Sequence, residues 1–250
     1  MGLFDRFKSD KDGNKSSSNV PNDSPAAKWA DKAGDKRAQN YDRQEAIAKL
    51  AEMASADAAA ALLKRFTFNI DPSITDQEEK DAAYNGILAA GEAAIAPVRV
   101  FAEKAESLAW PMKILKDLLD EDAFVEEIVL WLSRWDTEYS KFIDPKLQIL
   151  TALEEYKHPK IREAVEPFLL DVNEPARFHA IATTLAQEDA AAVSAIVDAL
   201  EQEESFRIKN KTAEGLVTRA WPIPADKRDA ARKALPSGYT VDAEGCVKKR

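Results

Sequence analysis

The stretch DVNEPARFHAIATTLAQ at residues 171–187 is followed directly by EDAAAVSAIVDALEQ at residues 188–202. In both segments apolar residues recur every three or four positions, which is the spacing of one face of an amphipathic helix. Polar residues and a proline stand at the start of the first segment, as expected where a helix begins. The two segments therefore predict a pair of antiparallel helices joined by a tight turn.

The same pattern of paired helices occurs on both sides of this stretch. DPKLQILTALEEY (144–156) precedes HPKIREAVEPFLL (158–170), and EESFRIKNKTAEGLVTRA (203–220) precedes IPADKRDAARKAL (223–235). One pair cannot bury both of its apolar faces, whereas stacked pairs bury them against each other. The repetition therefore predicts a stack of helical hairpins.

Apolar residues at helical spacing extend back to Arg43, with short polar breaks at regular intervals. The predicted helices lie at about 43–54, 57–68, 75–90, 92–106, 111–119, 121–135, 144–157, 159–170, 174–187, 189–202, 205–220 and 224–235. We therefore expect an all-α fold, an α-solenoid of about six antiparallel helical hairpins over residues 41–236.

Residues 1–40 are expected to form a flexible N-terminal tail, because they contain few large apolar side chains to offset the entropy of ordering. A short helix from Ala26 to Ala33 is an alternative for part of this segment. Leu3, Phe4 and Phe7 are at helical spacing beside basic residues. They predict a weak membrane or partner contact, with a loose terminus as the alternative.

The last segment, residues 237–250, contains two short extended runs around a turn with glycine. This pattern predicts a β-hairpin. An isolated hairpin is marginal in water, so we expect it to pack on the final helices and cap the stack.

The sequence from Asp171 to Leu185 resembles the first helix of a HEAT repeat, with Arg177 early in the helix after an acidic turn. Arg207 starts a similar pattern in the next helix pair. The first three pairs depart from it, since they lack the turn arginine. Similarity to the HEAT-repeat family implies a superhelix whose second helices line a concave surface that holds other macromolecules.

Composition favours a soluble protein with a basic partner. The net charge is −9, which disfavours binding to nucleic acid, where basic side chains must neutralise phosphates. No apolar run has the roughly 18 to 20 residues needed to cross a bilayer, and no secretory signal is present. The single cysteine, Cys246, fits a reducing compartment. We expect a cytoplasmic location.

No pattern typical of catalysis, metal binding or cofactor binding is present, so we expect a non-catalytic protein without a cofactor. The histidines, His158 and His179, have no cysteine or histidine neighbour to complete a zinc site, and we expect structural roles for both. Gly91 is expected to end a helix, while Gly86 and Gly215 are expected to let neighbouring helices approach closely.

Acidic residues recur on the predicted second helices of the third to fifth hairpins. If the stack is regular, they form an acidic ridge that binds a basic peptide or a basic protein surface. Alternatively, they are ordinary solvated helix faces. The six residues are Glu126, Glu127, Glu163, Glu166, Asp198 and Glu201.

The leading hypothesis is therefore a scaffold or adaptor that binds a protein partner. Two alternatives come from the HEAT resemblance: a nucleic-acid-binding protein similar to DNA glycosylases, and a chromophore lyase or chaperone. The first needs a basic track, yet residues 41–250 have 27 basic and 38 acidic residues, a net charge of −11. No residue argues for the second alternative.

Overall fold

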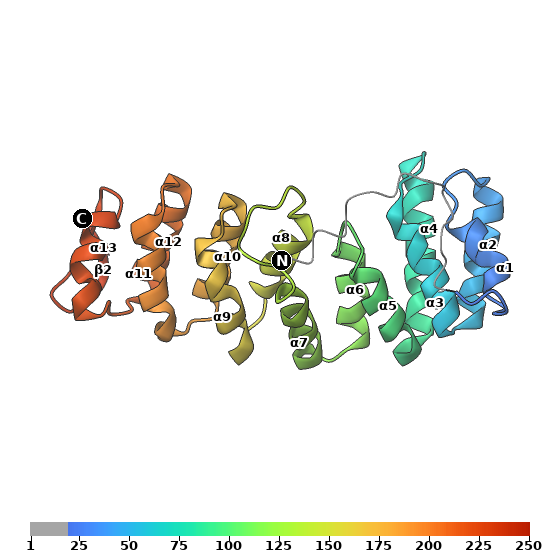
Figure 1. The fold of residues 1–250 in the computed structure, drawn as a ribbon, viewed down its shortest axis with the longest axis horizontal. Coiled ribbons are helices and arrows are strands. Elements are labelled where there is room, and N and C mark those ends of the chain that lie inside the picture. The colour runs from blue at the N-terminus through green and yellow to red at the C-terminus, as the bar shows by residue number, and fades with distance from the viewer. Residues whose placement is uncertain (1–19) are drawn as a thin grey trace. The chain divides into compact units, whose positions relative to one another are not determined.

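The computed structural model describes residues 20–250, whose regular structure is mainly helical (Figure 1). Over this range there are thirteen α-helices and one antiparallel sheet of two strands. The all-α fold with a C-terminal β-hairpin is confirmed. The predicted contact through Leu3, Phe4 and Phe7 lies outside the described residues.

Each range predicted from the apolar spacing contains a helix. The α-helices are α1 (Ala27–Ala33), α2 (Asn40–Met53), α3 (Ala56–Leu63), α4 (Ser73–Ala89), α5 (Ile95–Ala102), α6 (Ala109–Leu118), α7 (Glu121–Leu132), α8 (Asp144–Leu153), α9 (Pro159–Val165), α10 (Glu174–Ala186), α11 (Val193–Gln202), α12 (Phe206–Arg219) and α13 (Arg228–Ala234). Short 3-10 segments extend several of them, namely η2 (Lys64–Thr67), η3 (Gly91–Ala94), η4 (Glu166–Leu170), η5 (Ala190–Ala192) and η6 (Ala225–Lys227).

The alternative of a short helix from Ala26 to Ala33 is confirmed by α1, so a flexible tail up to residue 40 is wrong for the part that the structure describes. Helix α1 packs against α2 and α3, and its Ala30 and Ala33 are buried. Val20 and Ala26 are buried as well. Alanine side chains are small enough to bring backbones close together, so α1 packs mainly through its alanines.

The described chain divides into two compact units, one ending at Val98 and the other beginning at Arg99. In the first unit, α4 packs against α2 and α3. Gly86 lies where these helices meet: a Cβ there would be 2.7 Å from the Cβ of Ala51 and 2.9 Å from Cδ1 of Leu62. The close approach expected for Gly86 is therefore confirmed.

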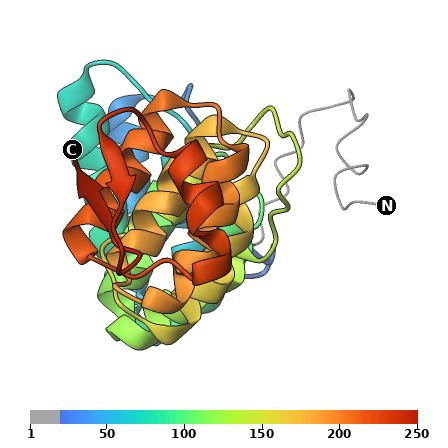
Figure 2. The same ribbon diagram turned by 90° about the vertical axis from the view of Figure 1, so that its left-hand side faces the viewer.

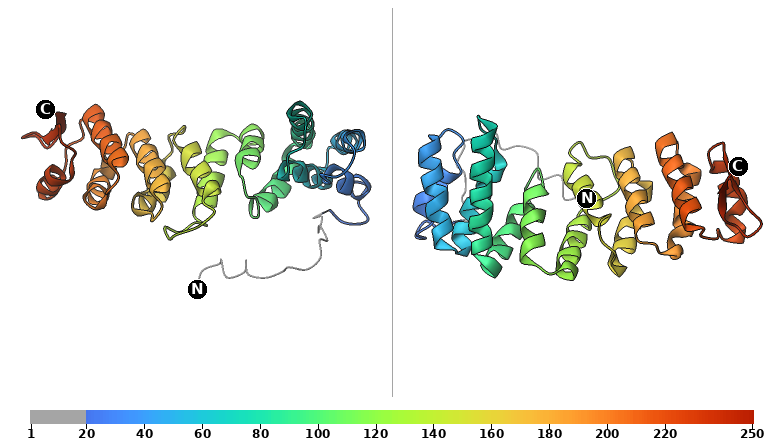
Figure 3. Two further views of the ribbon diagram at one scale, coloured as in Figure 1. Left: turned by 90° about the horizontal axis from the view of Figure 1, so that it is seen from above. Right: turned by 180° about the vertical axis from the view of Figure 1, so that it is seen from behind.

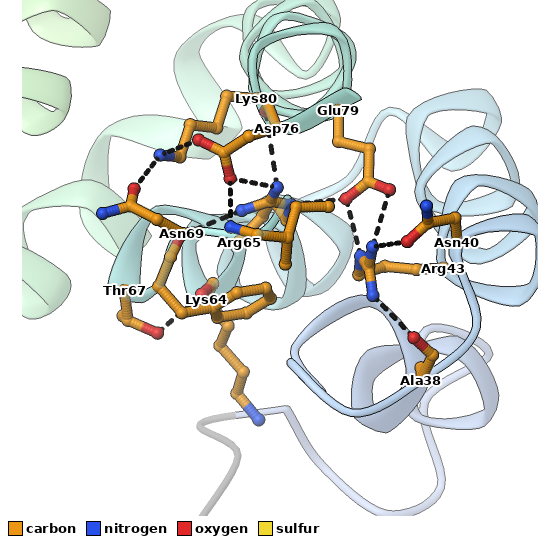
Figure 4. A network of polar contacts seen from close by, with 12 residues as sticks. Ala38, Asn40, Arg43, Lys64, Arg65, Thr67, Asn69, Asp76, Glu79 and Lys80 are labelled. Atoms are coloured by element: carbon orange, nitrogen blue, oxygen red, sulfur yellow. Dashed lines mark hydrogen bonds and ion pairs between the residues drawn. The ribbon is translucent and has the colours of Figure 1, made fainter. Parts of the chain in front are cut away.

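A buried ionic network joins the helices of the first unit (Figure 4). The Glu79 carboxylate of α4 accepts hydrogen bonds from Nε and Nη2 of Arg43 in α2, at 2.6 and 2.9 Å. It also accepts one from Nε of Arg65 in η2, at 2.7 Å. All three side chains are at most 1% exposed. One carboxylate therefore connects α2, η2 and α4.

Asp76, one turn earlier in α4, extends this network toward the surface (Figure 4). Its carboxylate accepts hydrogen bonds from Nη2 of Arg65 at 2.7 Å and from Nζ of Lys80 at 2.6 Å. Burial opposes ionisation of Asp76, but these hydrogen bonds outweigh it and hold its pKa below the usual value.

The second unit is built of helix pairs in two layers (Figure 3). In one layer α10 packs against α8 and α12. In the other, α9 packs against α7, and α11 packs against η4 and α13. Gly215 of α12 permits a close approach to α10, because a Cβ there would be 2.3 Å from Cδ1 of Leu185.

Cation–carboxylate pairs connect successive helix pairs of the second unit. Lys146, near the start of α8, donates to Asp171 in the loop before α10 at 2.6 Å, and both side chains are 0% exposed. Arg177, near the start of α10, pairs in the same way with Glu203 before α12, at 2.8 and 3.0 Å. These two ion pairs occupy equivalent positions, so the pair α10–α11 is joined to α8–α9 in the same way as α12–α13 is joined to α10–α11.

The C-terminal strands β1 (Tyr239–Val241) and β2 (Val247–Lys249) pair antiparallel, with Val241 opposite Val247. The hairpin lies beside α12 and α13, as expected (Figure 2). The guanidinium of Arg228 in α13 donates hydrogen bonds to the carbonyls of Ala243 and Glu244, at 3.0 and 2.9 Å. Both carbonyls lie in the turn of the β-hairpin. These bonds fix the turn on the last helix.

The contact at Gly86 predicts that Gly86→Ala destabilises the protein. Alanine has a helix propensity about 1 kcal/mol better than glycine. However, its methyl group would clash with Ala51, including the backbone Cα at 3.0 Å, and such overpacking costs about 1–3 kcal/mol. We therefore expect a lower midpoint in thermal or urea unfolding. The exposed neighbour Asn85 provides a control in the same helix: Asn85→Ala should leave stability unchanged or slightly raised, and equal effects of the two variants would contradict the packing argument.

The network around Glu79 predicts a larger effect for Glu79→Gln. The substitution preserves the side-chain shape but leaves two buried guanidinium groups without their shared countercharge. Breaking a buried ion pair in this way costs about 3–5 kcal/mol. Urea unfolding measures the loss, and Glu52→Gln, at an exposed pair with Lys49, is the control. A loss no larger than that of the control would show that Glu79 does not hold the unit together.

Candidate functional site

An open groove lies in the second unit between α9–η4 and α11. Its volume is about 430 Å³, within the range of about 300–1,000 Å³ typical of ligand pockets. The groove has a charged part, formed by Arg162, Glu163, Glu166 and Asp198, and an apolar part, formed by Pro167, Leu169, Leu170 and Ala195.

Local helix geometry places these side chains along the groove. Helix α9 begins at Pro159, and the side chain of His158 caps it by accepting from the amide of Lys160 at 3.2 Å. Arg162 and Glu166 are four residues apart and therefore share a helix face. On the opposite wall Ala195 and Asp198 share a face of α11 for the same reason, being three residues apart.

The apolar part of the groove includes a leucine that is open to solvent. Leu170, the last residue of η4, is 51% exposed, whereas its neighbour Leu169 is 4% exposed. Pro167 is exposed as well, and Ala195 is half-buried. The groove therefore presents an exposed leucine and proline beside carboxylates.

Arg162 forms ion pairs with three carboxylates around the groove. Its Nη1 lies 3.0 Å from Glu166, its Nη2 lies 3.7 Å from Glu163, and its Nε lies 2.7 Å from Asp189. Asp189 caps η5, which lies in the turn between the two helices of the next pair, α10 and α11. Arg162 thus connects α9 to the turn that precedes α11.

Asp198, on the opposite wall, is paired with Lys227 of η6, whose ammonium also contacts the carbonyl of Ser194. Among the residues that line the groove, Glu163, Glu166 and Asp198 supply three negative charges and Arg162 supplies one positive charge. The neighbouring Asp189 and Lys227 add one charge of each sign. The net charge of this set is −2. The groove therefore keeps an excess of negative charge even after its internal ion pairs are counted.

Three of the six residues predicted from the sequence line this groove, namely Glu163, Glu166 and Asp198. Glu126 lies elsewhere and pairs with Lys160 at 2.5 Å, which lowers the pKa of its carboxyl. Glu201 is exposed on α11 and forms no ion pair with another residue of the described range.

The surface position predicted for Glu127 is wrong. Its side chain is only 7% exposed, and its carboxylate accepts hydrogen bonds from Nε1 of Trp131 at 2.8 Å and from Nε of Arg99 at 2.9 Å. Trp131 follows Glu127 by one helical turn, so both point into the core. Helical spacing places Glu127 and Trp131 on the same face of the helix but does not show whether that face is buried or exposed.

Sequence reasoning missed Arg162, Pro167 and Leu170. A signal existed for Arg162, because an arginine four residues before Glu166 predicts an ion pair within one helix. Its contact with Asp189 depends on how two helix pairs meet and has no local signal. Nothing in the sequence distinguishes the exposed Leu170 from the buried Leu169.

The histidines have structural contacts. His158 caps α9, as described above, and His179 lies 3.2 Å from the hydroxyl of Thr151; burial lowers the pKa of His179. Within residues 20–250 no group of three or more His, Cys, Asp or Glu side chains is arranged to hold a metal ion. None of the helices in this range is long and apolar enough to span a membrane.

Comparison of the chain with protein families, with curated proteins and with solved structures gave no match. The resemblance to HEAT repeats therefore stays an expectation from the sequence.

Proposed function

We propose that this protein is a non-catalytic scaffold or adaptor that binds a basic, partly apolar segment of a partner protein. The groove between α9–η4 and α11 is the proposed docking surface. The observation that carries the proposal is the combination, in one groove, of excess negative charge with an exposed leucine and proline.

Charge complementarity favours a basic partner. The groove has a net charge of −2 by the count given above, and the whole chain has a net charge of −9. Carboxylates at the edge of a binding surface mainly accelerate and orient the encounter with a cationic partner. They also repel phosphates, which makes nucleic acid the less favoured ligand for this groove.

The apolar part of the groove supplies affinity that the exposed charges do not. Exposed carboxylates are screened by salt, so they provide little lasting affinity. Burying the exposed part of Leu170 under a partner's apolar side chain removes nonpolar surface from water, at about 25 cal/mol per Å². The proposed ligand therefore combines at least one cationic side chain with an apolar neighbour.

The packing of successive helix pairs in the second unit supports an α-solenoid organisation, which we propose for the chain as a whole. In such a stack neighbouring helix pairs form an extended surface, and recognition uses several weak contacts along it. We place this function in the cytoplasm, because the single cysteine fits a reducing compartment.

Charge reversal at the groove tests this proposal. The probe is a fluorescein-labelled hexapeptide of alternating leucine and arginine, and its anisotropy is measured with the full chain at low and at raised salt. The variant Glu163→Lys/Glu166→Lys should weaken binding on the order of tenfold or more and should reduce its salt dependence.

The control reverses two exposed loop carboxylates of the same unit outside the groove, Glu106→Lys/Glu138→Lys. It makes the same change in net charge, and we expect a much smaller effect on binding. A second probe with glutamate in place of arginine should not bind the unaltered protein. If both double variants weaken binding equally, or if the unaltered protein does not bind the basic probe, the groove is not the docking surface.

A further inference from the structure

We infer that Arg162 occupies a guanidinium subsite of this groove and that an arginine of the partner docks by displacing it. Arg162 then competes with the partner's arginine for the same carboxylates. This inference rests on the proposed function, and it specifies the ligand as an arginine next to an apolar residue.

The surroundings of Arg162 match the donor pattern of one guanidinium group. Nε, Nη1 and Nη2 each lie near a different carboxylate, those of Asp189, Glu166 and Glu163. A planar guanidinium offers donors in several directions within one plane, whereas a lysine ammonium is a compact point charge. A separate carboxylate near each of the three guanidinium nitrogens therefore favours arginine over lysine as the cation that binds here.

The charge balance leaves the subsite incompletely neutralised. Three carboxylates surround one guanidinium, so this cluster alone has a net charge of −2. Arg177 of α10 differs, because it is held by Glu203, which is 3% exposed, and by the backbone carbonyl of Asp171. Arg177 has the contacts of a structural pair, whereas Arg162 has the contacts of an open binding site.

Exposure makes the exchange of Arg162 possible. The carboxylate side chains of Glu163, Asp189 and Glu166 are 77%, 44% and 36% exposed, and Arg162 itself is 26% exposed. Ion pairs between exposed groups contribute little to stability. Arg162 can therefore leave its partners and become hydrated at small cost while a second guanidinium takes its place.

The neighbouring apolar surface explains why a partner's arginine would win this exchange. Pro167 and Leu170 line the same groove and remain exposed when Arg162 is in place. A partner with an apolar residue beside its arginine covers this surface, which the side chain of Arg162 does not do. The gain from apolar burial then adds to the ionic contacts, which are similar for the two arginines.

Two substitutions of Arg162 test the inference with the leucine–arginine hexapeptide described above. Arg162→Ala empties the subsite, and we expect affinity to rise about tenfold. Arg162→Lys keeps the net charge but replaces the planar donor set with a point charge, and we expect a rise of severalfold. A hexapeptide of leucine and lysine should gain less than the arginine probe from either change.

The charge-matched control is Lys157→Ala, which removes one cation from an exposed pair with Glu188 outside the groove. If Lys157→Ala raises affinity as much as Arg162→Ala, the effect is one of net charge and the inference is wrong. Weaker binding by Arg162→Ala would also contradict the inference, since Arg162 would then be part of the surface that holds the ligand. Thermal unfolding checks that each variant is folded, and Arg162→Lys provides the decisive comparison if the alanine variant is not.

Failure of this inference and failure of the proposed function give different results. If the unaltered protein binds the probe and loses it on charge reversal of Glu163 and Glu166, but Arg162→Lys and Arg162→Ala do not raise affinity, then only the displacement of Arg162 is contradicted. If neither the unaltered protein nor any Arg162 variant binds the probe, the docking groove itself is contradicted.

Discussion

The arrangement of the second unit depends on the buried ion pair between Lys146 and Asp171. A buried charge without a partner costs several kcal/mol, so a shift of α10 relative to α8 that separated this pair would be strongly unfavourable. Lys146 also donates to the carbonyl of Asp136 at 3.1 Å, and Asp171 accepts from the amide of Asn173 at 2.7 Å. Because Asp171 is fixed in this way, the preceding residue, Leu170, is held at the end of η4 beside the groove. The register of the helix pairs thus determines where the apolar part of the proposed docking surface lies.

Charged residues have two separate roles in this protein, and burial distinguishes them. The pairs of Glu79 with Arg43 and Arg65 are enclosed by the helices that they join, and they specify which elements meet. The ion pairs around Arg162 are open to solvent and contribute little to stability, so they can exchange partners. In the function proposed above, buried pairs keep the helices in one arrangement, while exposed carboxylates remain accessible to a basic partner.

The helices were predictable because apolar spacing, prolines and polar breaks are local features of the sequence. The close contacts at Gly86 and Gly215 and the β-hairpin were predictable for the same reason, since each depends on residue types with few structural alternatives. The packing of α1 was missed because it is built from alanines, which give a weak apolar signal. For the candidate site, the sequence identified Glu163, Glu166 and Asp198 but misplaced Glu127. Contacts between separate helix pairs, such as that of Arg162 with Asp189, and the exposure of Leu170 arise from tertiary packing, and no local pattern encodes them.

A double-mutant cycle at Lys146 and Asp171 tests most directly whether buried ion pairs set the register. The variants Lys146→Met, Asp171→Asn and the combination of the two are compared by urea unfolding. Each single change leaves one buried polar group without its partner, whereas the double change removes both charges. The account predicts a coupling energy of about 2 kcal/mol or more, so the double variant should be clearly more stable than the sum of the two losses implies. Losses that add within about 0.5 kcal/mol would contradict it, since the two side chains would then contribute independently.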